Sequence, residues 1–428
     1  MEKLTIKERI MNIKPMNVGR NFRSPRTLLI LYQVFAFLLA IYTKEEVSSK
    51  DFTLFIAAIF VILAVNLILP RITKGDPYLF LTVSMMFSIG VVMIYRLNPI
   101  SGANQIIWFF IGIGIIFFVF FAMKIFPFWH ELTVFYFVIM MIFFIITLIF
   151  GFGEGATNWV SFFGRTIQLS ELNKVIFVFY LASFHLNKGF LGKYEKYRPF
   201  ILMGSVYLFI AMFFLQKELG TALIFFGSYL LYLFVSGSDK KFIILNLLLS
   251  TFGAILAYLL FNHIRIRFTI WIDPWSHIND KGYQITQALF AISSGGFFGT
   301  GIGLGMPELI PVVTSDFIFA AICEEMGVFT GMGLIMLFLI LVYRGFKITL
   351  EQQDVFYKYL AFGISMMFAI QAIVIFGGVL KLIPLTGITI PFVSYGGSSM
   401  VSSCIALGVL QFCSSEYSRK AEQDGKNK

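Results

Sequence analysis

Charged side chains are scarce in this chain of 428 residues: Asp, Glu, Lys and Arg together make up 13% of it, whereas 58% is hydrophobic. The mean hydropathy is +0.85. This composition excludes a soluble globular fold, which could not cover so much apolar surface. Histidine and cysteine are also rare, with four and three residues. The histidines are dispersed and the cysteines lie in or beside apolar runs, so we expect neither a zinc site nor a disulfide framework.

The few charges are mainly basic, and the net charge is +10. The Lys and Arg residues lie in short connections beside apolar runs, a pattern typical of membrane orientation and not of nucleic-acid binding. The basic N-terminal segment lacks a small-residue cleavage site. We therefore expect no cleavable signal peptide, and a first apolar run that stays in the membrane.

Twelve apolar runs are long enough to cross the hydrocarbon core of a membrane as helices. They predict an all-α, polytopic integral membrane protein. The predicted spans are 27–43, 52–69, 77–95, 104–123, 132–151, 170–186, 199–215, 219–236, 241–261, 317–343, 357–380 and 393–413.

The distribution of cations predicts the orientation of these spans. With twelve crossings, most of the Lys and Arg residues fall on the same side as the basic N-terminal segment. The positive-inside rule then predicts that both termini are cytoplasmic and that the long loop 262–315 is extracellular. This loop is too long for a simple connector, and we expect an interfacial helix over 285–298, with Trp271 and Trp275 as anchors at headgroup level.

Ionisable residues at the edges of the spans are the candidates for chemistry, because a charge in the membrane is costly. Asp316 stands where the outer loop meets a span. It either caps the helix or, with its pKa raised by partial burial, serves as a general base. Glu324 and Glu325 follow on the same helix, inside the membrane, where an ion pair or hydrogen bond to a neighbouring helix is the plainer interpretation.

A second group of charges lies at the outer end of another span. Glu171 and Lys174 share a helix face, so they form an ordinary intrahelical pair or a site in which Lys174 binds an anionic group and Glu171 orients it. In the outer loop, Arg265 and Arg267 would add positive charge for a phosphate-bearing ligand, together with Lys381.

Short motifs recur in a fixed order along residues 75–413. The longest is 384–399, which contains Pro-Phe-Val-Ser-Tyr-Gly-Gly-Ser-Ser. The others lie at 155–156, 168–171, 219–222, 282–284, 295–296, 316–320 and 324–327. With these motifs the chain closely resembles the SEDS family (shape, elongation, division and sporulation), the FtsW/RodA/SpoVE group.

The resemblance implies a peptidoglycan glycosyltransferase that polymerises lipid II at the outer face of the cytoplasmic membrane, during division, elongation or sporulation. It also implies a class B penicillin-binding protein as partner. Asp316 matches the family's essential aspartate and is the expected catalytic residue. Glu325 is expected to be structural, within the membrane. The expected substrate-binding residues are Glu171, Lys174, Trp108, Arg267, Gln284, Ser394, Gly396 and Gly397. The glycine pair would also permit close packing of helices.

No cofactor is certain from the sequence. A divalent cation, Mg or Mn, is a hypothesis for neutralising the leaving pyrophosphate. Departures from the family pattern are Leu169 for a proline, Lys217-Glu218 for Pro-Asp, Ile375 for an asparagine and Lys381 for a glycine.

Members of the family usually have ten spans, so the first two helices look like an addition. The expected organisation is a basic cytoplasmic segment (1–26), an additional transmembrane hairpin (27–75), a SEDS-like core (76–413) and a cytoplasmic tail (414–428).

Two other functions remain open at this point. One is a lipid II flippase, and the other is a non-catalytic scaffold that recruits a transpeptidase. Asp316, Glu171 and Lys174 lie at one predicted face of the membrane, which favours the enzyme, because a flippase needs a polar path through the whole thickness.

Overall fold

The protein is described by a computed structural model covering residues 25–43, 48–153, 157–162 and 164–415. Most of the predicted segment 1–26, nearly all of the tail 414–428 and the motif at 155–156 lie outside these residues. The longer helices are α2 (Pro25–Tyr42), α3 (Ser49–Thr73), α4 (Leu79–Leu97), α5 (Pro99–Ile125), α6 (Thr133–Phe150), α7 (Leu169–Leu186), α8 (Arg198–Leu215), α9 (Leu219–Val235), α10 (Lys240–Leu260), α11 (Asn262–Ile272), α12 (Tyr283–Gly295), α13 (Ile318–Glu351), α14 (Val355–Val379) and α15 (Gly397–Cys413).

Each of the twelve predicted spans coincides with one of these helices. Among the described residues, nine helices are long and apolar enough to cross a membrane. Of the other three, α9 and α15 have 17 residues each, and the first turns of α7 carry Glu171 and Lys174. The prediction of an all-α polytopic membrane protein is confirmed.

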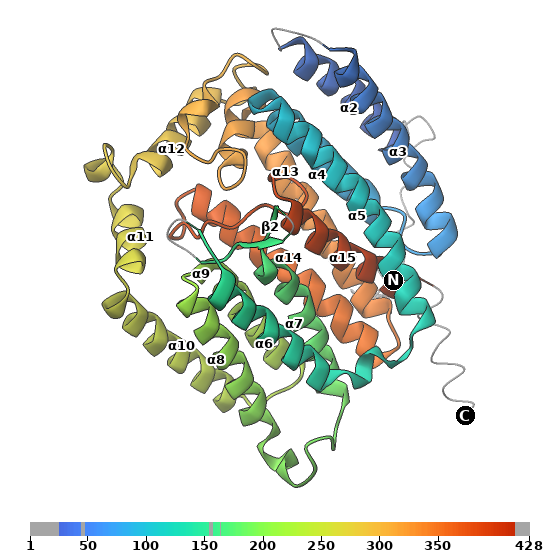
Figure 1. The fold of residues 1–428 in the computed structure, drawn as a ribbon, viewed down its shortest axis with the longest axis vertical. Helices are drawn as coiled ribbons and strands as arrows, with labels where there is room; N and C mark the ends of the chain where they lie inside the picture. Colours follow the sequence, from blue (N-terminus) through green and yellow to red (C-terminus); the bar gives the residue numbers. More distant parts are fainter. Residues whose placement is uncertain (1–24, 44–47, 154–156, 163, 416–428) are drawn as a thin grey trace, which may run out of the picture.

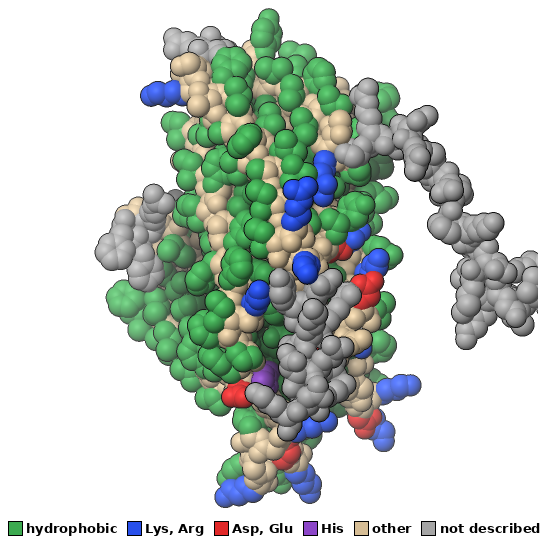
Figure 2. Space-filling model, turned by 90° about the vertical axis from the view of Figure 1, so that its right-hand side faces the viewer, with side chains coloured by type: hydrophobic (Ala, Val, Ile, Leu, Met, Phe, Trp, Pro, Cys, Tyr) green, Lys and Arg blue, Asp and Glu red, His purple; other side chains and the backbone are tan. Residues whose placement is uncertain are grey.

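Apolar side chains cover the outside of the bundle as well as filling its core. Phe60, Phe118 and Phe252 are each at least 66% exposed. Figure 2 shows one face on which hydrophobic side chains predominate, while charged side chains are few in its upper part and more frequent in its middle and lower parts. This is the surface expected of a protein whose solvent is lipid.

The bundle is built around α5, α7, α13, α14 and α15, which pack closely on one another. In Figure 1, α2 and α3 lie at one edge beside α4 and α5, and α10 and α11 lie at the opposite edge. Gln33 of α2 donates to Ser88 of α4 at 2.9 Å, and Asn66 of α3 donates to Ser84 of α4 at 3.1 Å. Hydrogen bonds between helices therefore fix the N-terminal hairpin to the rest of the bundle.

The long loop 262–315, predicted to be extracellular, has more structure than the sequence predicted. The end of the bundle at which this loop lies is called the outer end. The first part of the loop is helix α11, separated from α10 by the break at Phe261. The predicted helix 285–298 is present as α12, two residues earlier at its start and three at its end. Trp271 donates its indole N–H to the carbonyl of Lys381 at 3.0 Å, which ties α11 to the outer end of α14. A short antiparallel pair, β1 (Val160–Phe162) and β2 (Arg165–Ile167), was not foreseen.

Helix α13 is interrupted at Gly327, whose backbone has φ 84° and ψ 158°. A Cβ at this position would lie 2.4 Å from the carbonyl oxygen of Phe297, so only glycine fits. A continuous helix of this length would extend about 51 Å, well beyond a hydrocarbon core of about 30 Å. The break divides α13 into an outer segment that contains Glu324 and Glu325 and a longer segment that makes the span.

Candidate active site

Asp316 lies at the end of the turn that precedes α13. Two partners hold this turn from the loop 384–399: the backbone N–H of Tyr395 donates to the carbonyl of Thr314 at 2.9 Å, and the hydroxyl of Ser394 donates to the carbonyl of Ser315 at 2.6 Å. On its other side, Gln284 of α12 donates to the carbonyl of Pro311 at 3.0 Å. The predicted residue Gln284 therefore supports the Asp316 turn through the backbone.

Arg267 of α11 lies beside Asp316. A Cβ built on Gly387 would lie 3.3 Å from Oδ2 of Asp316 and 3.9 Å from Nη2 of Arg267, so both groups face the same glycine. The Arg267 guanidinium also donates to the carbonyl of Leu385 at 3.0 Å. Burial raises the pKa of the Asp316 carboxyl above its ordinary value, while a hydrogen bond from Ser315 and the charge of Arg267 lower it in part. A carboxylate with a raised pKa is suited to accepting a proton.

Glu171 and Lys174 form a buried ion pair at the outer end of α7. The Lys174 Nζ lies 2.9 Å from Oε1 of Glu171, and their side chains are 2% and 4% exposed. The second oxygen of Glu171 accepts a hydrogen bond from Ser402 of α15 at 2.9 Å. Glu171 and Lys174 therefore form the intrahelical pair that the sequence suggested as one interpretation. Ser402 of α15 joins them as a third residue that the sequence did not suggest.

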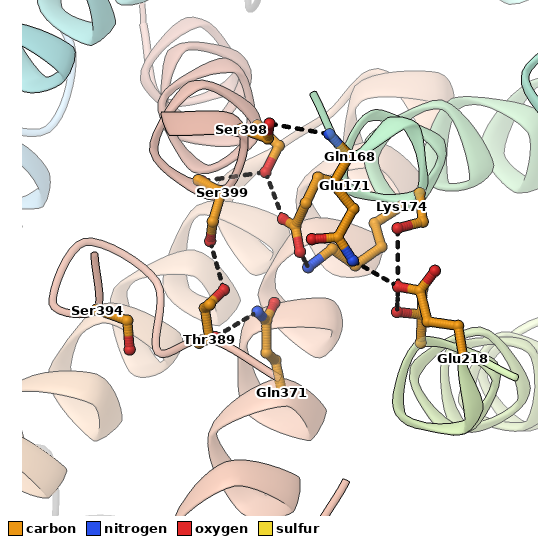
Figure 3. A network of polar contacts seen from close by, with 12 residues as sticks. Gln168, Glu171, Lys174, Glu218, Gln371, Thr389, Ser394, Ser398 and Ser399 are labelled. Carbon is orange, nitrogen blue, oxygen red and sulfur yellow. Dashed lines mark hydrogen bonds and ion pairs between the residues drawn. The ribbon is translucent and has the colours of Figure 1, made fainter. Parts of the chain in front are cut away.

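Glu218, just before α9, is a buried carboxylate next to this ion pair (Figure 3). Its Oε1 accepts hydrogen bonds from Gln168, Ser170 and Thr221 at 2.9, 2.8 and 2.6 Å. Its Oε2 is buried and accepts no hydrogen bond from the part of the chain that the structure describes. Burial raises the pKa of Glu218 to about 7. Only the departure Lys217-Glu218 from the family pattern pointed to this residue in the sequence.

The loop 384–399 runs between the Asp316 turn and the ion pair. At one end it faces Arg267 through Leu385. At the other end, Thr389 donates to Ser399 at 2.8 Å, and the carbonyl of Thr389 accepts from Gln371 of α14 at 3.1 Å. Ser398 accepts the backbone N–H of Gln168 at 3.1 Å (Figure 3). The loop thereby connects the two groups of charged residues.

Helix α5 fixes the middle of this loop. Gln105 donates to the carbonyl of Ser394 at 2.9 Å and accepts the N–H of Gly396 at 3.3 Å. The indole of Trp108 lies against Gly397, where an added Cβ would be 2.5 Å from the ring. Among the predicted substrate-binding residues, Trp108, Gly396 and Gly397 therefore meet at the start of α15, in contacts that shape the loop.

Glu325 is held by an ion pair at the outer end of α4. Its Oε1 lies 2.8 Å from Nη2 of Arg96, and its Oε2 accepts the N–H of Gly303 at 3.0 Å. Arg96 also pairs with Glu308. The neighbouring Glu324 accepts the N–H of Met306 at 2.9 Å. These contacts fasten the loop that precedes Asp316 to the outer segment of α13.

A cavity of about 720 Å³ opens beside Arg267. Helices α8, α9, α10 and α11 and the start of the loop 384–399 enclose it, and its lining is almost entirely apolar, with Phe214, Phe226, Ala254 and Phe268 among the residues. Among the described residues that line the cavity, Arg267 is the one that carries a charge. The cavity suits a hydrocarbon chain that carries an anionic group at one end.

No three His, Cys, Asp or Glu side chains gather into a possible metal site within the part of the chain that the structure describes. Asp316 is the carboxylate that lies beside Arg267. A divalent cation held by this carboxylate and by the phosphates of a substrate stays a prediction.

The predicted residues fall into separate groups. Asp316 and Arg267 lie together, while Glu171 and Lys174 form the buried pair on the other side of the loop. Glu218, Ser402 and Gly387 were missed. Ser402 gave no signal, since nothing in the sequence distinguishes it from the other three serines of α15, and Gly387 was hidden within a motif rich in turn formers. The roles in substrate binding stay predictions.

Comparison with known proteins identifies the family. The sequence model FTSW_RODA_SPOVE, described as cell cycle proteins, matches residues 76–419. The chain belongs to this family. The match begins after α3, so α2 and α3 lie outside it. The resemblance seen in the sequence is confirmed.

Individual members of the family agree with this assignment. The peptidoglycan glycosyltransferase RodA of Mycobacterium leprae is 33% identical over 362 residues, which cover 78% of this chain and 77% of the relative. Stage V sporulation protein E of Bacillus subtilis is 32% identical over 369 residues, covering 81% and 98%.

Solved structures show that the fold is shared. One, from a study of polymerisation and crosslinking by a peptidoglycan synthase complex, has a TM-score of 0.65 at 22% identity and covers 79% of this chain and 97% of its own. The RodA of Thermus thermophilus has a TM-score of 0.58 at 21% identity, covering 81% and 97%.

Proposed function

We propose that this protein is a peptidoglycan glycosyltransferase that joins lipid II molecules into glycan strands at the outer face of the cytoplasmic membrane. The names of its relatives support the reaction class. The observation that carries the proposal is the placement of a half-buried carboxylate, Asp316, beside Arg267 at the edge of an apolar cavity. If this site faces the outside of the cell, both termini are cytoplasmic, which is the orientation that the distribution of Lys and Arg predicts.

The reaction follows from the chemistry of these two groups. Asp316 accepts the proton of the GlcNAc 4-hydroxyl of one lipid II molecule as the oxygen attacks C1 of MurNAc in the other. The new glycosidic bond forms on the face opposite the leaving group, which inverts C1, and the C1–O bond to undecaprenyl pyrophosphate breaks with its electron pair on the pyrophosphate. A general base of this kind contributes about 10²- to 10⁴-fold to the rate.

We assign the cavity to one of the two substrates on geometric grounds. The base must lie about 3 Å from the attacking hydroxyl, which in turn lies about 3–3.5 Å from C1. The leaving pyrophosphate is attached to C1, so the donor's phosphates start close to Asp316. The acceptor's phosphates are a disaccharide away from its reacting hydroxyl. Arg267 is therefore positioned to neutralise the donor's pyrophosphate, and the adjoining cavity would hold the donor's polyprenyl chain.

The ion pair of Glu171 and Lys174 is closed and nearly inaccessible. Because the Lys174 side chain is only 2% exposed, a direct contact with substrate would require the residues that cover it to move. We propose that the pair maintains the polar centre beneath the loop 384–399, and that substrate reaches it only through a rearrangement. A class B penicillin-binding protein, which would crosslink the strands, is the partner that fits this activity.

The test is polymerisation of labelled lipid II by the purified protein in liposomes, with a glycosyltransferase-free partner present. Glycan strands that grow with time support the enzyme. In the same liposomes, a lipid II analogue with a quenchable fluorophore reports transbilayer movement. Transbilayer movement of the analogue without glycan strands would show a flippase instead of an enzyme. If neither activity is found, the non-catalytic scaffold is the function that the result supports.

A further inference from the structure

We propose that Ser394 is a positioning residue for Asp316: its hydroxyl holds the turn that carries the carboxylate. The sequence suggested that Ser394 contacts substrate, and the structure gives its hydroxyl a different task. The kinetic test of this inference rests on the proposed function, whereas the structural test does not.

The hydroxyl of Ser394 has no donor left for a ligand. It donates to the carbonyl of Ser315 at 2.6 Å and accepts the N–H of Ile390 at 2.9 Å, and the residue is 2% exposed. A serine hydroxyl has a single proton to donate. This hydrogen bond joins Ser394 to Ser315, which is 79 residues away in the sequence. Ser315 directly precedes Asp316.

Both bridged segments have unusual backbone conformations. Val312 has φ of 56° and Phe392 has φ of 65°, in the region that residues with a side chain rarely adopt, least of all a β-branched one. Such conformations persist only where the surroundings enforce them. Two hydrogen bonds hold these segments against each other: the hydroxyl of Ser394 donates to the carbonyl of Ser315, and the backbone N–H of Tyr395 donates to the carbonyl of Thr314.

The position of Asp316 depends on this bridge because its other side is already fixed. Phe317 and Ile318, which follow it, are completely buried at the start of α13. Residues 312–315, which precede it, are exposed or only partly buried, and the Ser394 hydroxyl restrains the last of them. Gln105 in turn restrains the backbone of Ser394 at 2.9 Å. A displacement of a reacting group by about 1 Å lowers the rate on the order of 10²-fold.

The experiment compares Ser394→Ala and Ser394→Thr with Ser365→Ala in steady-state polymerisation across pH. Ser365 is a matched control, since its buried hydroxyl bonds only within its own helix, to Ala361 at 2.6 Å. We expect Ser394→Ala to lower kcat by about 10- to 100-fold with KM little changed. We also expect the acid limb of its pH profile to move to lower pH, as the loosened turn admits water to Asp316. Ser394→Thr should recover part of the loss, and Ser365→Ala should behave like wild type.

Two results would overturn the proposal. If Ser394→Ala raises KM and keeps kcat, the hydroxyl binds substrate; if it behaves like Ser365→Ala, the bridge is irrelevant. Hydrogen–deuterium exchange in peptides covering 312–317 tests the bridge without any activity: faster exchange in Ser394→Ala than in Ser365→Ala supports it, and equal exchange contradicts it. An inactive wild type would refute the proposed function while leaving this second measurement decisive.

Discussion

Arg267 and Asp316 approach each other across Gly387, which has no side chain to separate them: a Cβ there would lie 3.3 Å from Oδ2 of Asp316 and 3.9 Å from Nη2 of Arg267. The guanidinium lowers the pKa of the carboxyl, and burial raises it, with burial the larger effect. The same arginine lines the apolar cavity. One cation thus connects the base to the site proposed for the leaving group.

Replacing Arg267 by Gln should affect both functions of this cation. Without the guanidinium, the pKa of Asp316 rises further, so the acid limb of the pH profile moves to higher pH. Loss of charge at the leaving pyrophosphate should lower kcat by about 10²-fold or more. Steady-state polymerisation between pH 5 and 9 measures both effects.

Arg265→Gln is the control for this variant. Arg265 lies on the same helix but is exposed, and it donates to the carbonyl of Leu259 at 3.0 Å. Unlike Arg267, Arg265 does not line the cavity, so we infer that it does not contribute to phosphate binding as the sequence suggested, and Arg265→Gln should retain wild-type kinetics. An unchanged pH profile in Arg267→Gln would contradict the coupling between the two residues.

Gly387→Ala should reduce activity by crowding the carboxylate. Gly387 has φ of 70°, a conformation that costs an alanine about 1–2 kcal/mol, and the new methyl group would press on Asp316. Gly114→Ala, at a helical site with open space around it, should be harmless. The melting temperatures of the two variants report backbone strain, and their polymerisation rates report crowding of Asp316. A Gly387→Ala protein with full activity would show that the reacting atoms lie elsewhere.

Filling the apolar cavity should discriminate between substrates by chain length. Ala254→Trp adds a large side chain to the lining of the cavity, whereas Leu248→Trp changes a position on the same helix that is 64% exposed. We expect Ala254→Trp to raise KM for undecaprenyl lipid II about tenfold or more and to change KM for a short-chain analogue much less. Equal effects on KM for the two substrates would show that the cavity does not bind the polyprenyl chain.

Glu218 should make stability depend on pH in an unusual direction. Its pKa is raised from 4.5 to about 7 in the folded protein. Between these values the unfolded chain loses the proton while the folded protein retains it, so stability falls as pH rises from about 4.5 to about 7. Glu218→Gln keeps an acceptor oxygen and should remove this contribution, giving a flatter curve of melting temperature against pH.

Glu218→Ala tests the other aspect of this residue. It would leave three donors without their acceptor, of which Ser170 and Thr221 are buried, at a cost of about 1–3 kcal/mol or more. It should therefore be less stable than Glu218→Gln at every pH. Identical melting curves for wild type and Glu218→Gln would show that the carboxyl titrates at its ordinary value.

The sequence predicted the helices well because runs of apolar residues are sufficient to specify membrane spans. It could not predict the break at Gly327, which depends on the close approach of Phe297, a segment 30 residues earlier. It singled out Asp316 and Arg267 separately. Their pairing across Gly387 depends on how the loop 384–399 folds between two helices, and nothing in local sequence encodes that. Ser394 was recognised within a motif, but its bond to Ser315 is visible only in three dimensions.

The central claim is that Asp316 is the base for glycosyl transfer. The most direct test is lipid II polymerisation by wild type, Asp316→Asn and Asp280→Asn, the last being an exposed aspartate in the same outer loop. We predict glycan strands from wild type and Asp280→Asn, and none from Asp316→Asn, although all three proteins melt at similar temperatures. Strands produced by Asp316→Asn at the wild-type rate would contradict the account.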